Sequence, residues 1–295
     1  WSDYNITMRE HGNACDMDLA AWVTLVNQSG GSYPDAQLKL VAGVVHRAPV
    51  GQASGAMQYA APAMRMAKDE SNAGFSESSL SEYHLYTLGR HTDLPDNSTK
   101  QLELFPAAHN IACRKQLVFT AGPVPWSYWS SPIVDQGYAA TSKGTVGSYL
   151  EFDNKKTNHL GMPMPGGRVR VNEANSSDGA LEFIGEDVIQ HTPRNETLRI
   201  KLGEAFDVVG ERKQTAFHVD SAGKTLDETF EISVRNRKKE AATVVVREYL
   251  YRWNNWQITE KNHAFNKQDA QTIDFPLDIA ADGEAKLTYT VRYSW

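Results

Sequence analysis

The chain has 295 residues, a formal net charge of -6 at pH 7 and 41% hydrophobic residues, which predicts one large sandwich or two packed lobes. Lysine and arginine are scattered among acidic residues, so the basic surface of a nucleic-acid-binding protein is excluded. No apolar run is long enough to cross a bilayer, and no transmembrane segment is expected. A chain of this length buries about three quarters of its unfolded surface, so the fold needs no metal or disulfide, and we expect no cofactor.

The first predicted elements are strands in the leading part of the chain. Apolar residues alternate with their neighbours from Leu19 to Leu25 and again from Leu38 to Val44, which is the period of a half-buried strand. The segment from Gly51 to Gly74 is rich in Ala, Met and Ser and follows no such period. We expect residues 51–74 to form a flexible insertion, as a mobile connection or a short helix, in an N-terminal β lobe of residues 1–120.

A proline-rich stretch comes next, from Ala121 to Thr145. Pro123, Pro125 and Pro132 exclude a central strand, so residues 121–145 are predicted to be a loop between two lobes. Residues 146–295 are then expected to form a C-terminal β-sandwich lobe.

The clearest strand pattern lies in this C-terminal part. From Ala285 to Trp295 every second residue is apolar or aromatic, which predicts a long half-buried strand. The turn Ser177-Asp178-Gly179 separates two strand-like runs, 168–173 and 180–184, and predicts a hairpin. Many strand candidates and no long amphipathic helix predict an all-β fold with an antiparallel β-sandwich architecture, as two packed lobes with long loops.

Two cysteines, Cys15 and Cys113, lie far apart in the sequence. Neither belongs to a Cys-x-x-Cys pair or lies beside a histidine, which argues against a zinc site. In an oxidising compartment they can form one disulfide that closes a long loop, and otherwise they are two separate buried thiols. The sequence leaves both alternatives open.

The most concentrated polar set contains Glu186, Asp187, His191, Asp207, Glu211 and Arg212. The catalytic candidates among them are Asp187, His191, Asp207 and Arg212. A catalytic interpretation pairs Asp187 with Asp207 and makes His191 a base or metal ligand, as in a metal- or carboxylate-dependent hydrolase. In the structural interpretation one aspartate closes a strand, the other opens a strand, and Arg212 pairs with them. We prefer the structural interpretation, because the corners of β-sandwiches commonly fix their loops in this way. The sequence also has no Gly-x-Ser-x-Gly, His-Glu-x-x-His or phosphate-loop motif.

Two aromatic segments indicate a third kind of site. Trp126 and Trp129 lie in the proline-rich loop, and Trp253 and Trp256 lie in a later aromatic run. Exposed rings with a polar edge form platforms for a sugar ring or a partner, so these four are candidate glycan-binding residues. The alternative is that these rings fill the core.

Several segments follow one another in a distinctive order: Leu160–Val171, Phe183–Asp187, His191–Pro193 and Gly203–Thr215, with shorter pieces at Leu40–Gly43, Tyr86–Leu88 and Asp96–Gln101. Over nearly its whole length the chain resembles the bacterial domain of unknown function 4139 family, which is also found as the C-terminal domain of mucoidy-inhibitor-like proteins. The aromatic run Tyr249–Trp256 departs from the Pro- or Gly-containing turn usual there.

The resemblance implies a β-rich fold, export across the inner membrane and a segment upstream of Trp1, and it implies no activity. The chain begins at Trp1 without a signal core, so we expect a processed product or a piece of a longer precursor.

These observations predict a secreted or cell-envelope protein, periplasmic or extracellular, that acts as a structural or binding module and not as an enzyme. Its expected partners are itself, through free sheet edges, or another envelope protein. Two alternatives stay open: a hydrolase using Asp187, His191 and Asp207, and a glycan-binding module using the aromatic residues. The hydrolase requires its three side chains to converge in one pocket.

Overall fold

The computed structural model describes residues 1–11, 14–43, 74–123, 130–175 and 177–295, and nearly all regular structure in them is β-strand. The one helical element among these residues is a single 3-10 turn, η1, at Lys156–Asn158. The prediction of an all-β, sandwich-like fold is confirmed. No helix in the described ranges is long and apolar enough to span a membrane. Of the insertion expected at 51–74, all but Gly74 lies outside the described residues.

The chain forms two compact units that alternate along the sequence. Unit 1 contains Trp1–Ala112 and Phe152–Leu198, and unit 2 contains Cys113–Glu151 and Arg199–Trp295. Three long strands supply residues to both units: β8 (Ser98–Thr120), β9 (Thr141–Asp153) and β12 (Thr197–Asp220). The observed units therefore differ from the contiguous lobes expected from the sequence. Alternation along a long strand shows which face is buried, but it does not show where the strand passes from one core to the next.

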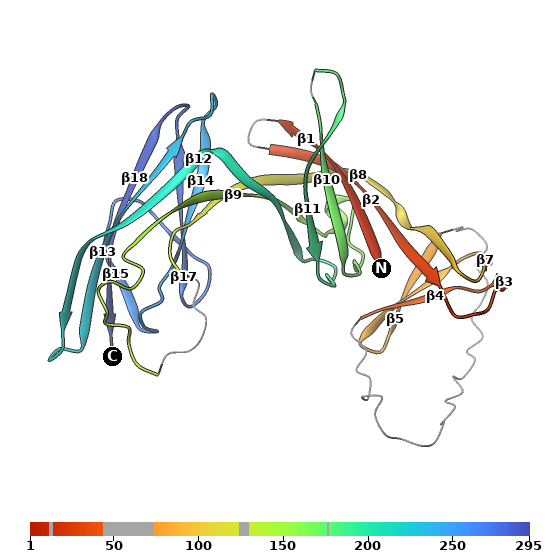
Figure 1. The fold of residues 1–295 in the computed structure, drawn as a ribbon, viewed down its shortest axis with the longest axis horizontal. Helices are drawn as coiled ribbons and strands as arrows, with labels where there is room; N and C mark the ends of the chain where they lie inside the picture. The colour runs from red at the N-terminus through yellow and green to blue at the C-terminus, as the bar shows by residue number, and fades with distance from the viewer. Residues whose placement is uncertain (12–13, 44–73, 124–129, 176) are drawn as a thin grey trace. The chain divides into compact units, whose positions relative to one another are not determined.

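Unit 1 contains one part of the largest sheet, in the strand order β11-β10-β1-β2-β8 (Figure 1). The strands besides β8 are β1 (Ser2–His11), β2 (Ala14–Asn27), β10 (Gly167–Ala174) and β11 (Leu181–Ile189). β10 and β11 form the predicted antiparallel hairpin, and β1 and β2 are also antiparallel. β1 and β10 instead run parallel, a pairing between distant parts of the chain that leaves no local sequence pattern.

Two small sheets complete unit 1. Their strands are β3 (Tyr33–Ala36) with β7 (Thr92–Leu94), and β4 (Lys39–Ala42) with β6 (Tyr83–Leu88) and β5 (Phe75–Leu80). Leu88 of β6 packs with Val23 and Leu102 in a buried cluster, which joins the three-stranded sheet to the large one. The strand expected at 38–44 is the shorter β4.

The part of the large sheet in unit 1 has an apolar inner face and a polar outer face. In β1 and β2 the alternating residues Tyr4, Ile6, Met17 and Leu19 are buried, while the residues between them are half-buried or exposed. The hydroxyl of Tyr4 donates a hydrogen bond to the carbonyl of Pro165 at 2.7 Å, so the segment before β10 covers the inner face. The outer face is left for other interactions.

Unit 2 contains the remaining strands. They are β13 (Thr225–Asn236), β14 (Ala242–Tyr249), β15 (Trp256–Lys261), β16 (Asn266–Lys267), β17 (Thr272–Ile279) and β18 (Glu284–Ser294). One layer has the order β12-β13-β18-β15, and β14 pairs with β17 and, in parallel, with β8. The ring of Phe275 from β17 stacks on that of Tyr289 from β18, with 5.3 Å between centroids. The two groups of strands therefore pack as layers of a sandwich over one apolar core.

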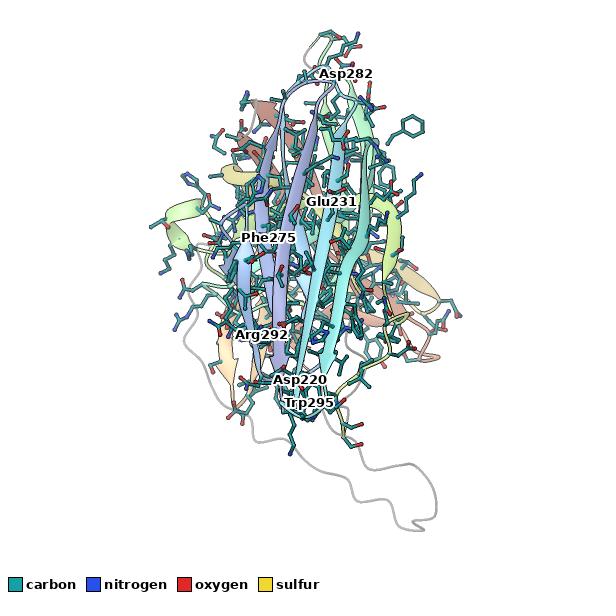
Figure 2. All side chains as sticks on the ribbon, turned by 90° about the vertical axis from the view of Figure 1, so that its left-hand side faces the viewer. Asp220, Glu231, Phe275, Asp282, Arg292 and Trp295 are labelled. Atoms are coloured by element: carbon teal, nitrogen blue, oxygen red, sulfur yellow. The ribbon has the colours of Figure 1, made fainter. Side chains whose placement is uncertain are left out.

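The last strand of unit 2 agrees with the sequence pattern. The alternation predicted for 285–295 is observed in β18. Figure 2 shows β13 and β18 side by side, with Asp220 and Asp282 at opposite ends of the layer. Lys224 lies in the turn between β12 and β13, and Asp282 lies in the turn between β17 and β18. Their φ angles of 52° and 48° are in the left-handed region, which tight turns commonly use.

Both cysteines are oxidised. Cys15 and Cys113 are disulfide-bonded, so neither is a separate buried thiol.

A charged cluster holds the pair of strands β1 and β2 together on the outer face. Arg9 donates from Nη1 and Nη2 to the Asp18 carboxylate at 2.9 and 3.0 Å, and the Asn110 N–H donates to Asp18 at 3.1 Å. The Arg9 guanidinium holds the pKa of Asp18 well below its usual range, and the Asn110 N–H acts in the same direction. Such a carboxylate stabilises the fold above the pKa of the unfolded state and loses this effect as the pH falls through its folded pKa.

We therefore expect Asp18→Asn to lower the free energy of unfolding at neutral pH, and this difference to shrink progressively below about pH 4. Denaturant unfolding of both proteins at neutral and acid pH measures the effect. Glu103→Gln, at an exposed position of β8, is the control for losing one negative charge. A loss of stability that is the same at both pH values would contradict the prediction.

Candidate ligand-binding face

The outer face of the unit 1 sheet carries a regular grid of side chains. Strand register places four residues in each of three rows that cross β2, β1, β10 and β11. The first row is Trp22, Asp3, Arg168 and Val188; the second is Ala20, Asn5, Arg170 and Glu186; the third is Asp18, Thr7, Asn172 and Phe183. These residues share one face because they occupy alternate positions, opposite the buried residues of each strand.

A β-bulge in β11 brings Phe183 to this face. Phe183 pairs with Asn172 and Gly185 pairs with Val171, so Ile184 is an extra residue in β11. Without the extra residue, Phe183 would share the inner face with the buried Gly185. With it, the ring of Phe183 is 63% exposed at the edge of the grid.

Two ion pairs cross the centre of the grid. Arg168 donates from Nη2 and Nε to Asp3 Oδ1 at 3.1 and 3.3 Å, and Arg170 donates from Nε to Glu186 Oε2 at 2.7 Å. Arg168 Nη1 also lies 4.0 Å from Glu186 Oε1. The Glu186 carboxylate raises the pKa of Arg170 by accepting its hydrogen bond. These four charges compensate one another, so the centre of the face is polar and carries no net charge.

Neutral amides and a cleft lie beside these ion pairs. Asn172 Nδ2 donates to Asn5 Oδ1 at 2.8 Å. A cleft of about 630 Å³ runs over the grid, with Trp22 and Gln101 on one side and Phe183 on the other. This volume falls within the range of about 300–1,000 Å³ that small-molecule sites occupy. The cleft thus combines two aromatic rings, neutral amides and compensated charges.

The predicted catalytic set is divided between the two units. Asp187 and His191 belong to unit 1 and Asp207 belongs to unit 2, so the convergence that a hydrolase requires is observed within neither unit. Asp187 Oδ1 accepts the Val188 N–H at 2.8 Å, and His191 Nδ1 accepts the Gly166 N–H at 3.0 Å. The expectation that Asp207 opens a strand is wrong, because Asp207 lies in the interior of β12, whereas Asp187 lies close to the end of β11.

His191 lines a smaller cavity of about 170 Å³ together with His84 and Tyr86. His84 Nδ1 lies 2.7 Å from Glu77 Oε1, as expected of a histidine satisfied within a sheet. Across the part of the chain that the structure describes, no group of three His, Cys, Asp or Glu residues could hold a metal ion. The Nδ1 atoms of both histidines bind neighbouring strands and loops.

Arg212, the fourth candidate, is fully buried in unit 2. Its Nε donates to both carboxylate oxygens of Glu248 at 3.2 and 3.1 Å, and its Nη1 donates to the Ala139 carbonyl at 2.6 Å. It therefore pairs with a glutamate, where an aspartate partner was expected. Burial is the largest single influence and lowers the pKa of Arg212, but the Glu248 carboxylate together with Tyr289, Tyr251 and Glu228 raises it overall.

The candidate tryptophans are found only in part. Trp253 and Trp256 are half-buried against the core of unit 2. Trp256 Nε1 donates to the Ala270 carbonyl at 2.8 Å, which fixes its ring. Trp126 and Trp129 fall within 124–129, outside the described residues.

No family model and no curated protein matches the chain. The resemblance to the domain of unknown function 4139 family therefore stays a prediction.

Sequence reasoning selected one residue of the cleft, Glu186, as part of a polar set and missed the others, although part of the signal was present. Arg168 and Arg170 alternate with Val169 and Val171, which places both arginines on the face opposite two valines. The approach of Asp3 to Arg168 depends on the parallel pair of β1 and β10, which no local pattern indicates.

Proposed function

We propose that this chain is a non-catalytic binding module of the bacterial cell envelope or extracellular space, and that the outer face of unit 1 binds a glycan. The observation that carries the proposal is the cleft between Trp22 and Phe183, lined by side chains whose charges compensate one another. An aromatic ring packs against the apolar C–H face of a sugar, while amides and charged groups bind its hydroxyls.

Binding is favoured over catalysis by the state of the two carboxylates in the cleft. Asp3 and Glu186 each accept hydrogen bonds from an arginine of the same face, so both carboxylates are already engaged within the protein. They are held as parts of a recognition surface.

The sheet edges favour binding on the face over self-assembly through strand addition. At one end of the strand order, β11 contains a bulge and three acidic residues, Glu182, Glu186 and Asp187. At the other end, β15 also contains a bulge, next to Glu260 and Lys261. Bulges and charges are the features by which natural sheets block edge-to-edge pairing.

The proposed compartment is supported by the cysteines. Cys15 and Cys113 are both disulfide-bonded, and disulfides persist in exported proteins, whereas the cytosol keeps most thiols reduced. The family resemblance points in the same direction.

A glycan array, followed by calorimetric titration of the best hits, tests the proposal. We expect Phe183→Ala to weaken binding of those hits at least fivefold, because it removes one aromatic wall of the cleft. Phe206→Ala is the matched control, since Phe206 is also a strand phenylalanine, 96% exposed, in unit 2. Equal effects of the two substitutions, or an array without hits, would contradict the proposal.

A further inference from the structure

The charges in the cleft indicate which class of glycan it binds. This inference rests on the proposed function. We infer that the face binds a neutral, extended oligosaccharide and discriminates against acidic ones. Three features of the grid carry this inference: its charge pairing, its amide groups and the separation of its two rings.

Charge pairing argues against an acidic ligand. Each arginine in the grid already binds a carboxylate of the protein, Arg168 with Asp3 and Arg170 with Glu186. A uronic acid carboxylate would approach two protein carboxylates, and it would have to replace one of them on its guanidinium. Placing like charges together at a recognition surface disfavours the wrong partner. A neutral sugar requires no such exchange.

The amides match the hydroxyls of a neutral sugar. An amide side chain donates hydrogen bonds from its nitrogen and accepts them at its oxygen, and a sugar hydroxyl can likewise donate and accept. Asn5 and Asn172 use one donor and one acceptor on each other, and Gln101 lies on the Trp22 side of the cleft. Each amide has further donor or acceptor capacity for a ligand hydroxyl.

The positions of the rings indicate an extended ligand. Trp22 and Phe183 occupy opposite corners of the grid, three strands apart in the first and third rows. Strand spacing and rise per residue then put their Cα atoms roughly 20 Å apart along the diagonal. A single sugar ring cannot contact both aromatic rings, whereas an oligosaccharide laid across β1 and β10 can.

The test is a titration of the full chain with matched sugars, followed by calorimetry and by the indole N–H signal of Trp22. The neutral probes are cellohexaose, chitohexaose and mannohexaose with their monosaccharides, and the acidic probes are hexamers of glucuronate and mannuronate. We expect one neutral hexasaccharide to bind at least tenfold more tightly than its monosaccharide and than either uronate hexamer. Equal or tighter binding of a uronate would overturn the inference while leaving glycan binding intact. If the monosaccharide binds as tightly as the hexasaccharide, the inference that the site binds an extended ligand is overturned. If no probe of either series binds, the proposed function itself fails.

A charge substitution tests the discrimination directly. Glu186→Gln releases Arg170 from its carboxylate, so we expect the ratio of uronate to neutral affinity to rise at least fivefold. Glu182→Gln is the matched control, because it changes the net charge of β11 by the same amount. Glu182 accepts a hydrogen bond from Asn175 and does not line the cleft. Asp3→Asn, which releases Arg168, is a second variant if Glu186→Gln unfolds. An unchanged ratio in the folded variant would overturn the inference.

Discussion

Replacing Glu228 by glutamine is expected to lower the free energy of unfolding by about 3–5 kcal/mol, because it leaves a buried guanidinium without its counter-charge. Glu228 and Arg252 have no solvent-exposed surface, and Arg252 donates from Nε and Nη2 to the two carboxylate oxygens at 2.8 and 2.7 Å. This bidentate pair needs two acceptor oxygens, and the amide of glutamine offers only one, so it cannot replace the carboxylate.

The same guanidinium also holds a loop of unit 2 in place. Arg252 Nη1 donates to the carbonyls of Ile133 and Asp135 at 2.9 and 2.8 Å, and Nη2 donates to the Tyr138 carbonyl at 3.2 Å. Loss of the pair is therefore expected to release the loop before β9 as well as to destabilise the core. Amide hydrogen exchange over residues 130–140 should rise together with the loss of stability.

Denaturant unfolding measures the main effect, with Glu231→Gln as the control. Glu231 lies on the same strand but on the outer face, where its Oε1 is 3.9 Å from Lys286 Nζ (Figure 2). An exposed pair of this kind contributes at most about 1 kcal/mol. Replacing Glu228 and Arg252 together by methionine should recover part of the loss, because it removes both buried charges. Equal effects of Glu228→Gln and Glu231→Gln would refute the account of a buried pair.

The position of Glu228 shows what sequence patterns can and cannot predict. The alternation of Leu226, Phe230, Ile232 and Val234 correctly indicates the buried face of β13. Glu228 falls on the same face, so its burial was predictable in principle from the period alone. Its partner was not, because Arg252 follows β14, the next strand along the chain, and no pattern brings it to this point of the core.

The candidate site was harder to predict from the sequence, since it depends on the pairing of distant strands and on a β-bulge. The hairpin of β10 and β11 was predictable from its turn, but the extra residue Ile184 was not, and that residue decides which face Phe183 occupies. Asp187, Asp207 and His191 were selected because they are close in sequence. Strands are extended, so closeness in sequence over tens of residues does not bring side chains together.

Trp22→Ala is expected to weaken binding of the preferred neutral hexasaccharide at least about tenfold, or about 1.4 kcal/mol. Trp22 is half-buried on β2, directly opposite Asp3, so its ring position is set by the sheet and little ordering is needed on binding. Truncation removes the indole ring from the lining of the cleft and leaves its polar groups in place.

Trp22→Phe separates ring stacking from packing, because it keeps an aromatic face on a smaller ring. We expect it to lose less than half of the binding free energy that Trp22→Ala loses, while both variants keep the unfolding midpoint within a few degrees of the parent protein. Calorimetry with the same hexasaccharide, beside thermal unfolding of each variant, decides the point. If Trp22→Ala binds the hexasaccharide as tightly as the parent protein does, the ligand does not lie across this face, and the exposed ring of Phe183 does not mark a glycan site.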